Sequence, residues 1–341
     1  MATPTAGRPT PERIFNIFSA YQDTAALNAG IELDVFTAIG AGANTPASIA
    51  AKTSASERGV RILCDYLTIL GLLTKEQGRY TLTQDAAVFL DRKSPACLAS
   101  MTGFLCQPRH QKNFNLLTEA VRKGGSAGAG GDNTQPQDEF WVAFAKSMAP
   151  LTIHAAAFIA QLIGAPEGKA CEVLDIAAGH GMYGITIAKQ NPNAQIVAVD
   201  WPAVLEVAKE NARAAGVASR YQSRAGSAFD ADLGEGYDFV LLTNIFHHFD
   251  KPACEKLMRR THAALKPGGK GVTLEFVPNE DRVTPPTAAS FSLVMLANTD
   301  AGDAYTFAEY EKMFRNAGFA KSTLHLIPEM PQQVIVSEKA G

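Results

Sequence analysis

The sequence predicts an α/β protein with a parallel sheet in its C-terminal half and a mostly helical region before it. Two patterns predict the sheet. An apolar run over 171–176 contains an acid, Asp175, and gives way to a glycine turn and a helical pattern. A second β-like run over 195–199 ends on Asp200, 25 residues after the first acid. A carboxylate at that strand end can accept hydrogen bonds from both hydroxyls of a ribose.

The glycine turn after the first strand lets a ligand approach the backbone. Gly179, Gly181 and Gly184 fit the register G-x-G-x-x-G, which in a dinucleotide fold places a pyrophosphate at the N-terminus of the following helix. The same register fits a fold that binds a nucleoside without a pyrophosphate, so the turn alone leaves both folds open. The turn begins with Ala177, where we expect a negative φ, because a methyl group beside the ligand is tolerated only in that conformation.

The elements that follow favour the fold without a pyrophosphate. The turn Pro267–Gly269 leads into a strand that carries Glu275 and that we expect at the sheet edge, and such a turn is not typical of a dinucleotide fold. The predicted elements are a third strand over 237–242 ending at Thr243 and Asn244, a helix over 254–265, a strand over 271–276, a helix over 306–316, and an antiparallel pair over 322–327 and 333–338. This order resembles that of class I S-adenosylmethionine-dependent methyltransferases.

The resemblance covers nearly the whole chain and is closest to the plant-type small-molecule O-methyltransferases and their bacterial relatives. His247 occupies the position of that family's general base, and Glu275, 28 residues later, that of the glutamate after the next strand. The resemblance implies a Rossmann-like methyltransferase domain, an N-terminal dimerisation domain, S-adenosylmethionine as cofactor and S-adenosylhomocysteine as product. Trp201 and Phe229 would stack on adenine. The implied cofactor-binding residues are Asp175, Ala177, Gly179, Gly181, Asp200, Trp201, Ser227, Ala228, Phe229, Thr243 and Asn244.

The resemblance also implies an acceptor pocket, and the scattered cysteines imply no metal site. Three apolar residues of one predicted helix match a stripe that walls this pocket in the family, and their i, i+4, i+8 spacing equally suits a helix that buries a core face. The sequence departs from the family where Ser227 replaces an acidic adenine contact, Thr243 a lysine, and Ala304 a second pocket glutamate. The implied pocket residues are Phe140, Phe144, Met148, Met295 and Thr299.

The chemistry of methyl transfer explains why these residue types matter. Transfer from a sulfonium is an in-line displacement, in which positioning of the reactants supplies about 7 to 11 kcal/mol of the barrier. A phenol must also lose its proton, and a histidine, with an unperturbed pKa of about 6.5, suits that transfer near neutral pH. We therefore expect His247 to be the base. Glu275 either fixes its tautomer or pairs with a nearby cation, and we interpret His248 as a surface or helix-cap residue.

The N-terminal region predicts a winged helix that mediates dimerisation. The predicted elements are helices over 11–29, 31–39, 45–50 and 56–73, with Thr45 as the cap of the third, and a β-wing over 75–82 around Gly78. A winged helix also suggests a DNA-binding regulator. The charges of its candidate recognition helix balance, however, which leaves little attraction for phosphate. We expect a winged-helix-like dimerisation domain over 1–105, a helical linker and acceptor-pocket region over 106–166, and the methyltransferase domain over 167–341.

Composition limits the remaining classes. The chain has 341 residues, 46% of them hydrophobic, and a net charge of −3, so it can bury two cores and has no positive field for nucleic acid. Its five cysteines contain no C-x-x-C pair. No apolar run is long enough to span a membrane, so we expect a cytoplasmic protein without a membrane partner. The glycine-rich residues 124–131 predict a flexible loop.

Together these features predict a homodimeric S-adenosylmethionine-dependent methyltransferase that acts on a hydroxyl of a small, aromatic acceptor. Three alternatives stay open: carbon methylation of a pigment-like ring, a diverged reaction such as hydroxylation, which the missing glutamate at Ala304 permits, and a winged-helix regulator. A pocket lined by Phe and Met specifies the size and apolarity of an acceptor but not its identity.

Overall fold

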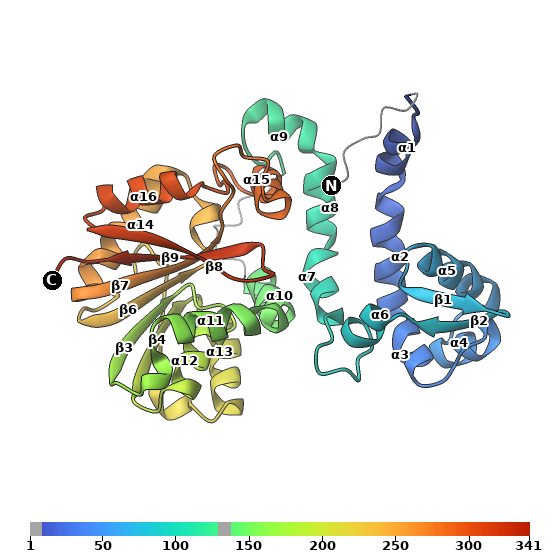
Figure 1. Cartoon of the computed structure of the whole chain (residues 1–341), viewed down its shortest axis with the longest axis horizontal. Coiled ribbons are helices and arrows are strands. Elements are labelled where there is room, and N and C mark those ends of the chain that lie inside the picture. Colours follow the sequence, from blue (N-terminus) through green and yellow to red (C-terminus); the bar gives the residue numbers. More distant parts are fainter. Residues whose placement is uncertain (1–8, 129–137) are drawn as a thin grey trace. The chain divides into compact units, whose positions relative to one another are not determined.

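The computed structural model describes residues 9–128 and 138–341, which form two compact units divided between Thr102 and Gly103 (Figure 1). The first unit contains helices and a two-stranded sheet, and the second contains a seven-stranded sheet. The segment 106–166, which we expected as a separate linker, belongs to the second unit. The sheet unit therefore begins some 60 residues earlier than the strand pattern suggests.

The first unit has helices followed by a β-hairpin, in the predicted order. Thr45 caps α4 through a capping box with Ser48. Asp34, with a φ of 60°, separates α2 from α3, so the break lies later than predicted. Leu73 opens a strand and does not end a helix. The elements are α1 (Glu12–Ser19), α2 (Tyr21–Glu32), α3 (Val35–Gly40), α4 (Pro46–Thr53), α5 (Glu57–Ile69), β1 (Leu73–Glu76), β2 (Arg79–Leu82) and α6 (Gln84–Phe89).

The sheet of the second unit has the strand order β5-β4-β3-β6-β7-β9-β8. Its first five strands are parallel, and β9 is antiparallel to both β7 and β8. The expectation that β7 lies at the sheet edge is wrong, because the C-terminal pair adds to it. The strands are β3 (Cys171–Ile176), β4 (Ala194–Asp200), β5 (Tyr221–Ala225), β6 (Tyr237–Thr243), β7 (Leu265–Phe276), β8 (Lys321–Leu326) and β9 (Gln332–Glu338).

Strand β5 is absent from the prediction made from the sequence. Only Tyr221 and Ala225 of its five residues are apolar, so hydrophobic periodicity does not identify it. With β5 included, β6 is the fourth strand of the second unit and not the third.

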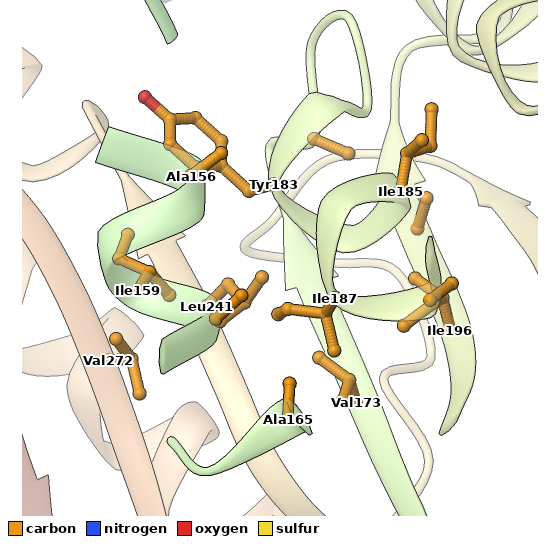
Figure 2. Close-up of a cluster of buried hydrophobic side chains, with 14 of the residues drawn as sticks. Ala156, Ile159, Ala165, Val173, Tyr183, Ile185, Ile187, Ile196, Leu241 and Val272 are labelled. Carbon is orange, nitrogen blue, oxygen red and sulfur yellow. The ribbon is translucent and has the colours of Figure 1, made fainter. Parts of the chain in front are cut away.

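Helices cover both faces of this sheet (Figure 1). Neighbouring residues of β3 divide between two cores, since Val173 packs with α11 and α12 and Leu174 packs with α14 and α16. Figure 2 shows the first core, where Ile159 and Ile187 lie in one cluster with Val173. Because both faces are buried, the central strands are mostly apolar. The helices are α11 (Ile153–Leu162), α12 (Met182–Gln190), α13 (Pro202–Ala214), α14 (Lys251–Ala264) and α16 (Phe307–Asn316).

A helical segment that precedes the sheet packs against α15. The N–H of Ser126 donates to the carbonyl oxygen of Thr299 (2.8 Å), and Gly125 lies against the backbone of Asp300, where a Cβ has no room. Residues 125–128 of the glycine-rich run are therefore packed and not a free loop, while 129–131 lie outside the described residues. The helices are α7 (Thr102–Leu105), α8 (Pro108–Asn115), α9 (Leu117–Lys123), α10 (Asp138–Met148) and α15 (Pro286–Asn298).

Two kinds of feature are missing from the described part of the chain. No single helix there has the length and apolarity needed to cross a membrane, and only a bent pair, Glu139–Met148 with Ile153–Leu162, meets these criteria jointly. No three His, Cys, Asp or Glu side chains within 9–128 and 138–341 gather as a metal ion would require.

Candidate active site

The predicted site residues gather at the carboxyl ends of the parallel strands. The chain passes from β3 to β4 and β5 on one side and then to β6 and β7 on the other, so the strand order reverses beside β3. Ligands of open α/β sheets bind outside the strand ends at such a point. Asp200 ends β4, Thr243 ends β6, and Glu275 lies near the end of β7. The fold thus brings the cofactor and catalytic candidates to one edge of the sheet.

The turn between β3 and α12 has a left-handed backbone, which is strained only at Ala177. Ala177, Gly179 and Gly181 all have positive φ, of 55°, 57° and 74°. The negative φ predicted at Ala177 is therefore wrong. The N–H of Ala178 donates to a carbonyl oxygen of β4 (3.2 Å), and this tie holds the turn in place. A Cβ at Gly181 would lie 2.5 Å from the Tyr221 hydroxyl, whereas at Gly179 only the Ala177 carbonyl oxygen comes within 4 Å, so space beside Gly179 is open.

Asp200 connects this turn to the start of α13. Its Oδ2 accepts from the N–H of Gly179 (2.8 Å) and its Oδ1 from the N–H of Trp201 (2.7 Å). Burial raises the pKa of Asp200 to about 6, and the two hydrogen bonds oppose that rise. At neutral pH the carboxylate is ionised and offers its remaining lone pairs to hydroxyl donors.

Asp175 lies beneath the same turn and lacks partners. Its side chain is fully buried, its Oδ2 accepts only from the N–H of Gly184 (3.3 Å), and its Oδ1 has no hydrogen-bond partner among the described residues. Burial raises the pKa of Asp175 to about 7. The hydroxyl of Tyr221 is likewise buried and unpartnered within the described ranges. An open turn, an ionised acid at a strand end and buried polar atoms without partners fit a nucleoside cofactor such as S-adenosylmethionine.

The residues predicted around adenine after β5 make local contacts. The Oγ of Ser227 accepts from the N–H of Phe229 (3.1 Å), so the serine shapes the loop where the family has an acid. The carbonyl oxygen of Ala228 accepts from Nε of Arg260 (3.1 Å). The Phe229 ring packs edge-on against Phe249, with centroids 4.9 Å apart. These loop positions are ordered by the protein itself, and their contacts to adenine stay a prediction.

The remaining cofactor candidates also contact protein neighbours. Trp201 packs beside Ala145 of α10. Asn244 has a φ of 57°, and its Oδ1 accepts a hydrogen bond from Nε2 of Gln332. Thr243, where the family has a lysine, is buried at the end of β6. Roles of these three side chains in cofactor binding remain predictions.

His247 and Glu275 form a buried pair. His247 lies in a short 3-10 helix, Phe246–His248, that follows β6. Its Nδ1 lies 2.6 Å from Oε2 of Glu275, and the other carboxylate oxygen accepts from the N–H groups of Ile245 (3.0 Å) and Phe246 (2.8 Å). A carboxylate only accepts, so Nδ1 carries the ring proton and Nε2 keeps a lone pair. This hydrogen bond is the one that a role for Glu275 in fixing the tautomer requires.

His248 is neither a surface residue nor the helix cap, contrary to our interpretation. Its ring lies 4.3 Å from that of His247 and 5.5 Å from that of Trp141, and its Nδ1 is buried without a partner in the part of the chain described. Asp250 is the cap, since its Oδ1 accepts from the N–H of Ala253 (2.9 Å). Burial, together with the adjacent His247, holds the pKa of His248 well below its usual range, so the ring is neutral.

Two aromatic residues near the pair escaped the sequence-based prediction. Phe291 of α15 packs edge-on against His247 (4.9 Å) and stacks on Phe276 (3.9 Å). It precedes Met295 by four residues, and this spacing places both on one helix face, so a signal for Phe291 was present. Trp141 of α10, which packs against His248, lies beside the predicted stripe and not on it, so periodicity gives no indication of it.

The predicted pocket residues of α10 lie in an aromatic cluster. Phe140 is buried, and Phe144 and Met148 are half-buried. The ring of Phe104 lies 5.1 Å from those of Phe140 and Phe144. The stripe therefore packs against other aromatic side chains of the second unit, as either a core face or a pocket wall would.

The predicted pocket residues of α15 are buried. Met295 and Thr299 are 3% and 0% exposed. The Thr299 hydroxyl donates to the Met295 carbonyl oxygen (2.8 Å) and accepts from the N–H of Gly302 (2.8 Å), so it already has partners. Ala304, at the position of the family's second glutamate, is also buried. The only acid beside His247 in the described residues is thus Glu275.

Known families match both units. A model of the O-methyltransferase domain matches residues 147–320, and a model of the O-methyltransferase dimerisation domain matches residues 15–92. The 3-hydroxy-5-methyl-1-naphthoate 3-O-methyltransferase of Streptomyces sahachiroi is 29% identical over 90% of this chain and 89% of its own length. The acetylserotonin O-methyltransferase of Mus musculus is 27% identical over 98% of this chain and 92% of its own.

Solved structures agree with this match. A candidate O-methyltransferase from Nostoc punctiforme has 52% sequence identity and a TM-score of 0.93, covering 98% of this chain and 100% of that one. Human N-acetylserotonin methyltransferase in complex with SAM has 21% identity and a TM-score of 0.85, covering 99% and 100%. At that identity the likeness shows the fold alone.

Proposed function

The chain belongs to the O-methyltransferase family, and on that premise we propose that it methylates a hydroxyl of a small aromatic acceptor with His247 as the base. The hydrogen bond of 2.6 Å between His247 Nδ1 and Glu275 Oε2 carries the proposal. S-adenosylmethionine, when bound, supplies an electrophilic methyl group on a sulfonium. The residues of the chain hold the two reactants and remove the proton of the acceptor.

The proton moves to His247 Nε2, the ring nitrogen that keeps a lone pair. Glu275 stabilises the imidazolium that forms, because a carboxylate at Nδ1 favours the charged ring. The base contributes roughly 10² to 10⁴ in rate. Glu275 also holds the N–H groups of Ile245 and Phe246, so the loop that carries the base does not need to rearrange during transfer.

Cofactor binding is assigned to the β3 to β4 edge of the site. Asp200 accepts hydrogen bonds from the ribose hydroxyls, and the turn at Gly179 admits the ligand to the backbone. An aromatic acceptor is supported by the rings of Phe291 and Trp141 beside the histidines, since such rings pack against aromatic ligands. The two curated relatives described above are named for aromatic substrates, which supports the same class.

A test measures which atom receives the methyl group. The protein is incubated with methyl-labelled S-adenosylmethionine and a panel of phenols, naphthols and hydroxynaphthoic acids, and products are identified by mass and NMR. We expect methyl ethers. Methylation on carbon would point to the alternative that needs no oxygen base, and transfer to none of the panel, with cofactor bound, would contradict the aromatic hydroxyl acceptor.

We also propose that the first unit forms a homodimer and is not a DNA-binding module. Helix α1 exposes four large apolar side chains, Ile14, Phe15, Ile17 and Phe18, by 58% to 73%, and exposed apolar patches mark interaction surfaces. The double variant Phe15→Ser/Phe18→Ser should shift the mass measured by light scattering from dimer to monomer. Val283→Ser, at an exposed apolar residue of the second unit, should leave the dimer intact. A monomeric wild type would overturn the proposal.

A further inference from the structure

His110 of α8 has one ring nitrogen without a partner. Its Nδ1 lies 3.3 Å from Oδ1 of Asn298, at the end of α15. Its Nε2 is buried and has no hydrogen-bond partner among residues 9–128 and 138–341. A buried polar atom left unpaired destabilises the structure, so a ligand that supplies a donor there gains binding energy.

The neighbours of His110 determine which ring nitrogen carries the proton. Nδ2 of Asn298 donates to the carbonyl oxygen of Val294 (2.9 Å), and its Oδ1 accepts from Nδ2 of Asn113 (2.9 Å). Because an amide oxygen only accepts, His110 Nδ1 is the donor to Asn298. The neutral ring then presents a bare lone pair at Nε2. Burial lowers the pKa of His110, which keeps the ring neutral.

This lone pair lies in the same aromatic cluster as the predicted pocket residues. The His110 ring is 4.8 Å from that of Phe104 and 5.9 Å from that of Phe140. Although Nε2 itself is covered, the His110 and Phe104 side chains are only half-buried. A ligand therefore reaches this nitrogen only when the rings that cover it move aside.

Helix α15 relates His110 to the proposed base. Phe291 contacts the His247 ring, and Asn298, seven residues further on, holds His110. Seven residues of α-helix rise about 10 Å. Ring contacts also join the two histidines through Phe140, Trp141 and His248. This row of aromatic side chains thus has a proton acceptor near each end, His247 and His110.

We propose that His110 Nε2 accepts a hydrogen bond from a second donor, a hydroxyl or N–H, at the end of the acceptor opposite the hydroxyl that is methylated. The inference rests on the proposed function, since it places the reacting hydroxyl at His247. A site built to accept such a donor discriminates against an analogue that lacks it, because the buried acceptor is then left unpaired. The acceptor class is accordingly narrowed to elongated aromatic compounds with polar donors at both ends.

Binding to the full chain saturated with S-adenosylhomocysteine tests the inference without catalysis. Calorimetry compares 2,6-dihydroxynaphthalene with 2-naphthol, which differ only in the second hydroxyl. In wild type we expect the diol to bind at least about ten times more tightly. In His110→Phe the two should bind equally, with the affinity for 2-naphthol unchanged.

Two further variants complete the design. His110→Leu removes the same lone pair and replaces His110→Phe if that protein does not fold. His325→Phe makes the same change on β8, at the outermost strand of the sheet, and should keep the preference for the diol.

Equal affinities in wild type, a preference that survives in His110→Phe and His110→Leu, or no binding of either compound would overturn the inference. The proposed function can be contradicted independently of the inference about His110. Discrimination by wild type, lost in the His110 variants, without any methylated product would leave the role of His110 intact and remove the role of His247.

Discussion

Two buried carboxylates of the same sheet differ in the number of hydrogen bonds that they accept. Glu275 on β7 has three hydrogen bonds, two from backbone N–H groups and one with His247. Asp175 on β3 has a single one, from Gly184 at 3.3 Å, and an oxygen without a partner in the described part of the chain. Both side chains are 0% exposed. Burial is therefore the same, and only the supply of donors differs.

This difference indicates how the site is prepared. Fully satisfied buried polar groups rigidify their surroundings, whereas an unpaired one destabilises the fold. In the proposed catalytic half, around His247 and Glu275, the carboxylate has its hydrogen bonds within the protein. In the proposed cofactor half, around Asp175 and Asp200, one oxygen of Asp175 has no partner among the described residues, and a nucleoside with its own donors would supply one. Four substitutions test this contrast.

Replacement of the proposed base should have the largest effect on activity and should act on the proposed catalytic half alone. His247→Gln is expected to lower single-turnover methyl transfer by roughly 10² or more. Its dissociation constant for S-adenosylhomocysteine should stay unchanged, because the proposal places this side chain beside the acceptor and not beside the cofactor. His325→Gln provides a control with the same change outside the site. Equal rates for His247→Gln and wild type would leave positioning as the main source of catalysis.

Asp175→Asn should stabilise the protein without ligand at high pH. The folded-state pKa near 7 lies above the ordinary aspartate value of 3.8, so the folded protein binds this proton more tightly than the unfolded chain. The free energy of unfolding of wild type therefore falls as pH rises from about 4 to about 7. At pH 8 the ionised side chain costs up to about 4 kcal/mol.

Denaturant titrations at pH 5 and pH 8 measure this effect. The stability gain of Asp175→Asn over wild type should be larger at pH 8 than at pH 5. An equal gain at the two pH values, or a loss at pH 8, would mean that Asp175 is partnered after all and that the two halves of the site do not differ as described.

Removal of the charge at Asp200 should weaken cofactor binding. Hydrogen bonds to a charged group contribute about 1.5 to 3 kcal/mol, so Asp200→Asn should raise the dissociation constant for S-adenosylhomocysteine about 10- to 150-fold at pH 8. Wild-type affinity should also fall as pH drops through about 6, where the carboxyl group becomes protonated. Calorimetry measures the dissociation constant of the variant and the pH dependence of wild type. Asp230→Asn, at an exposed residue of the loop after β5, is the control. A pH-independent affinity in wild type would rule out the assignment.

Relief of strain in the glycine turn should have the smallest effect. A left-handed conformation costs a residue with a side chain about 1 to 2 kcal/mol, so Ala177→Gly should raise the free energy of unfolding by about 1 kcal/mol. Ala178→Gly is the matched control, since its φ is not positive and glycine should lower stability there. Thermal unfolding of both variants compares them. If Ala177→Gly is the less stable of the two, the turn is not strained.

Much of the fold follows from hydrophobic pattern, and the exceptions have local causes. Strands β3, β4 and β6 are apolar runs because both of their faces are buried. Strand β5, at the edge of the sheet, has a sequence of mixed polarity and escapes detection. The place of β7 in the sheet depends on where the C-terminal strand pair packs, and that pair lies some 60 residues further along the chain. The sequence of β7 itself therefore does not indicate its neighbour.

Contacts within the site were predictable where the interval between two residues along the chain determines that they meet. His247 and Glu275 lie on adjacent strand ends, so the interval between them is sufficient. The contacts of His110, Trp141 and Phe291 join α8, α10 and α15, and no single interval relates these helices. The positive φ of Ala177 also escaped prediction, because the hydrogen bond from Ala178 to β4 that maintains it is a tertiary contact.

Glu275 binds the backbone of the loop after β6 with one oxygen and the imidazole of His247 with the other. Selection for the shape of the loop and selection for the proposed base therefore both act on this residue. A descendant chain that abandoned the base would still need the acid to hold residues 245 and 246. On the proposed mechanism, glutamate at this position in a newly sequenced homologue therefore indicates the shape of the loop, and the residue at position 247 indicates whether the proposed base is kept.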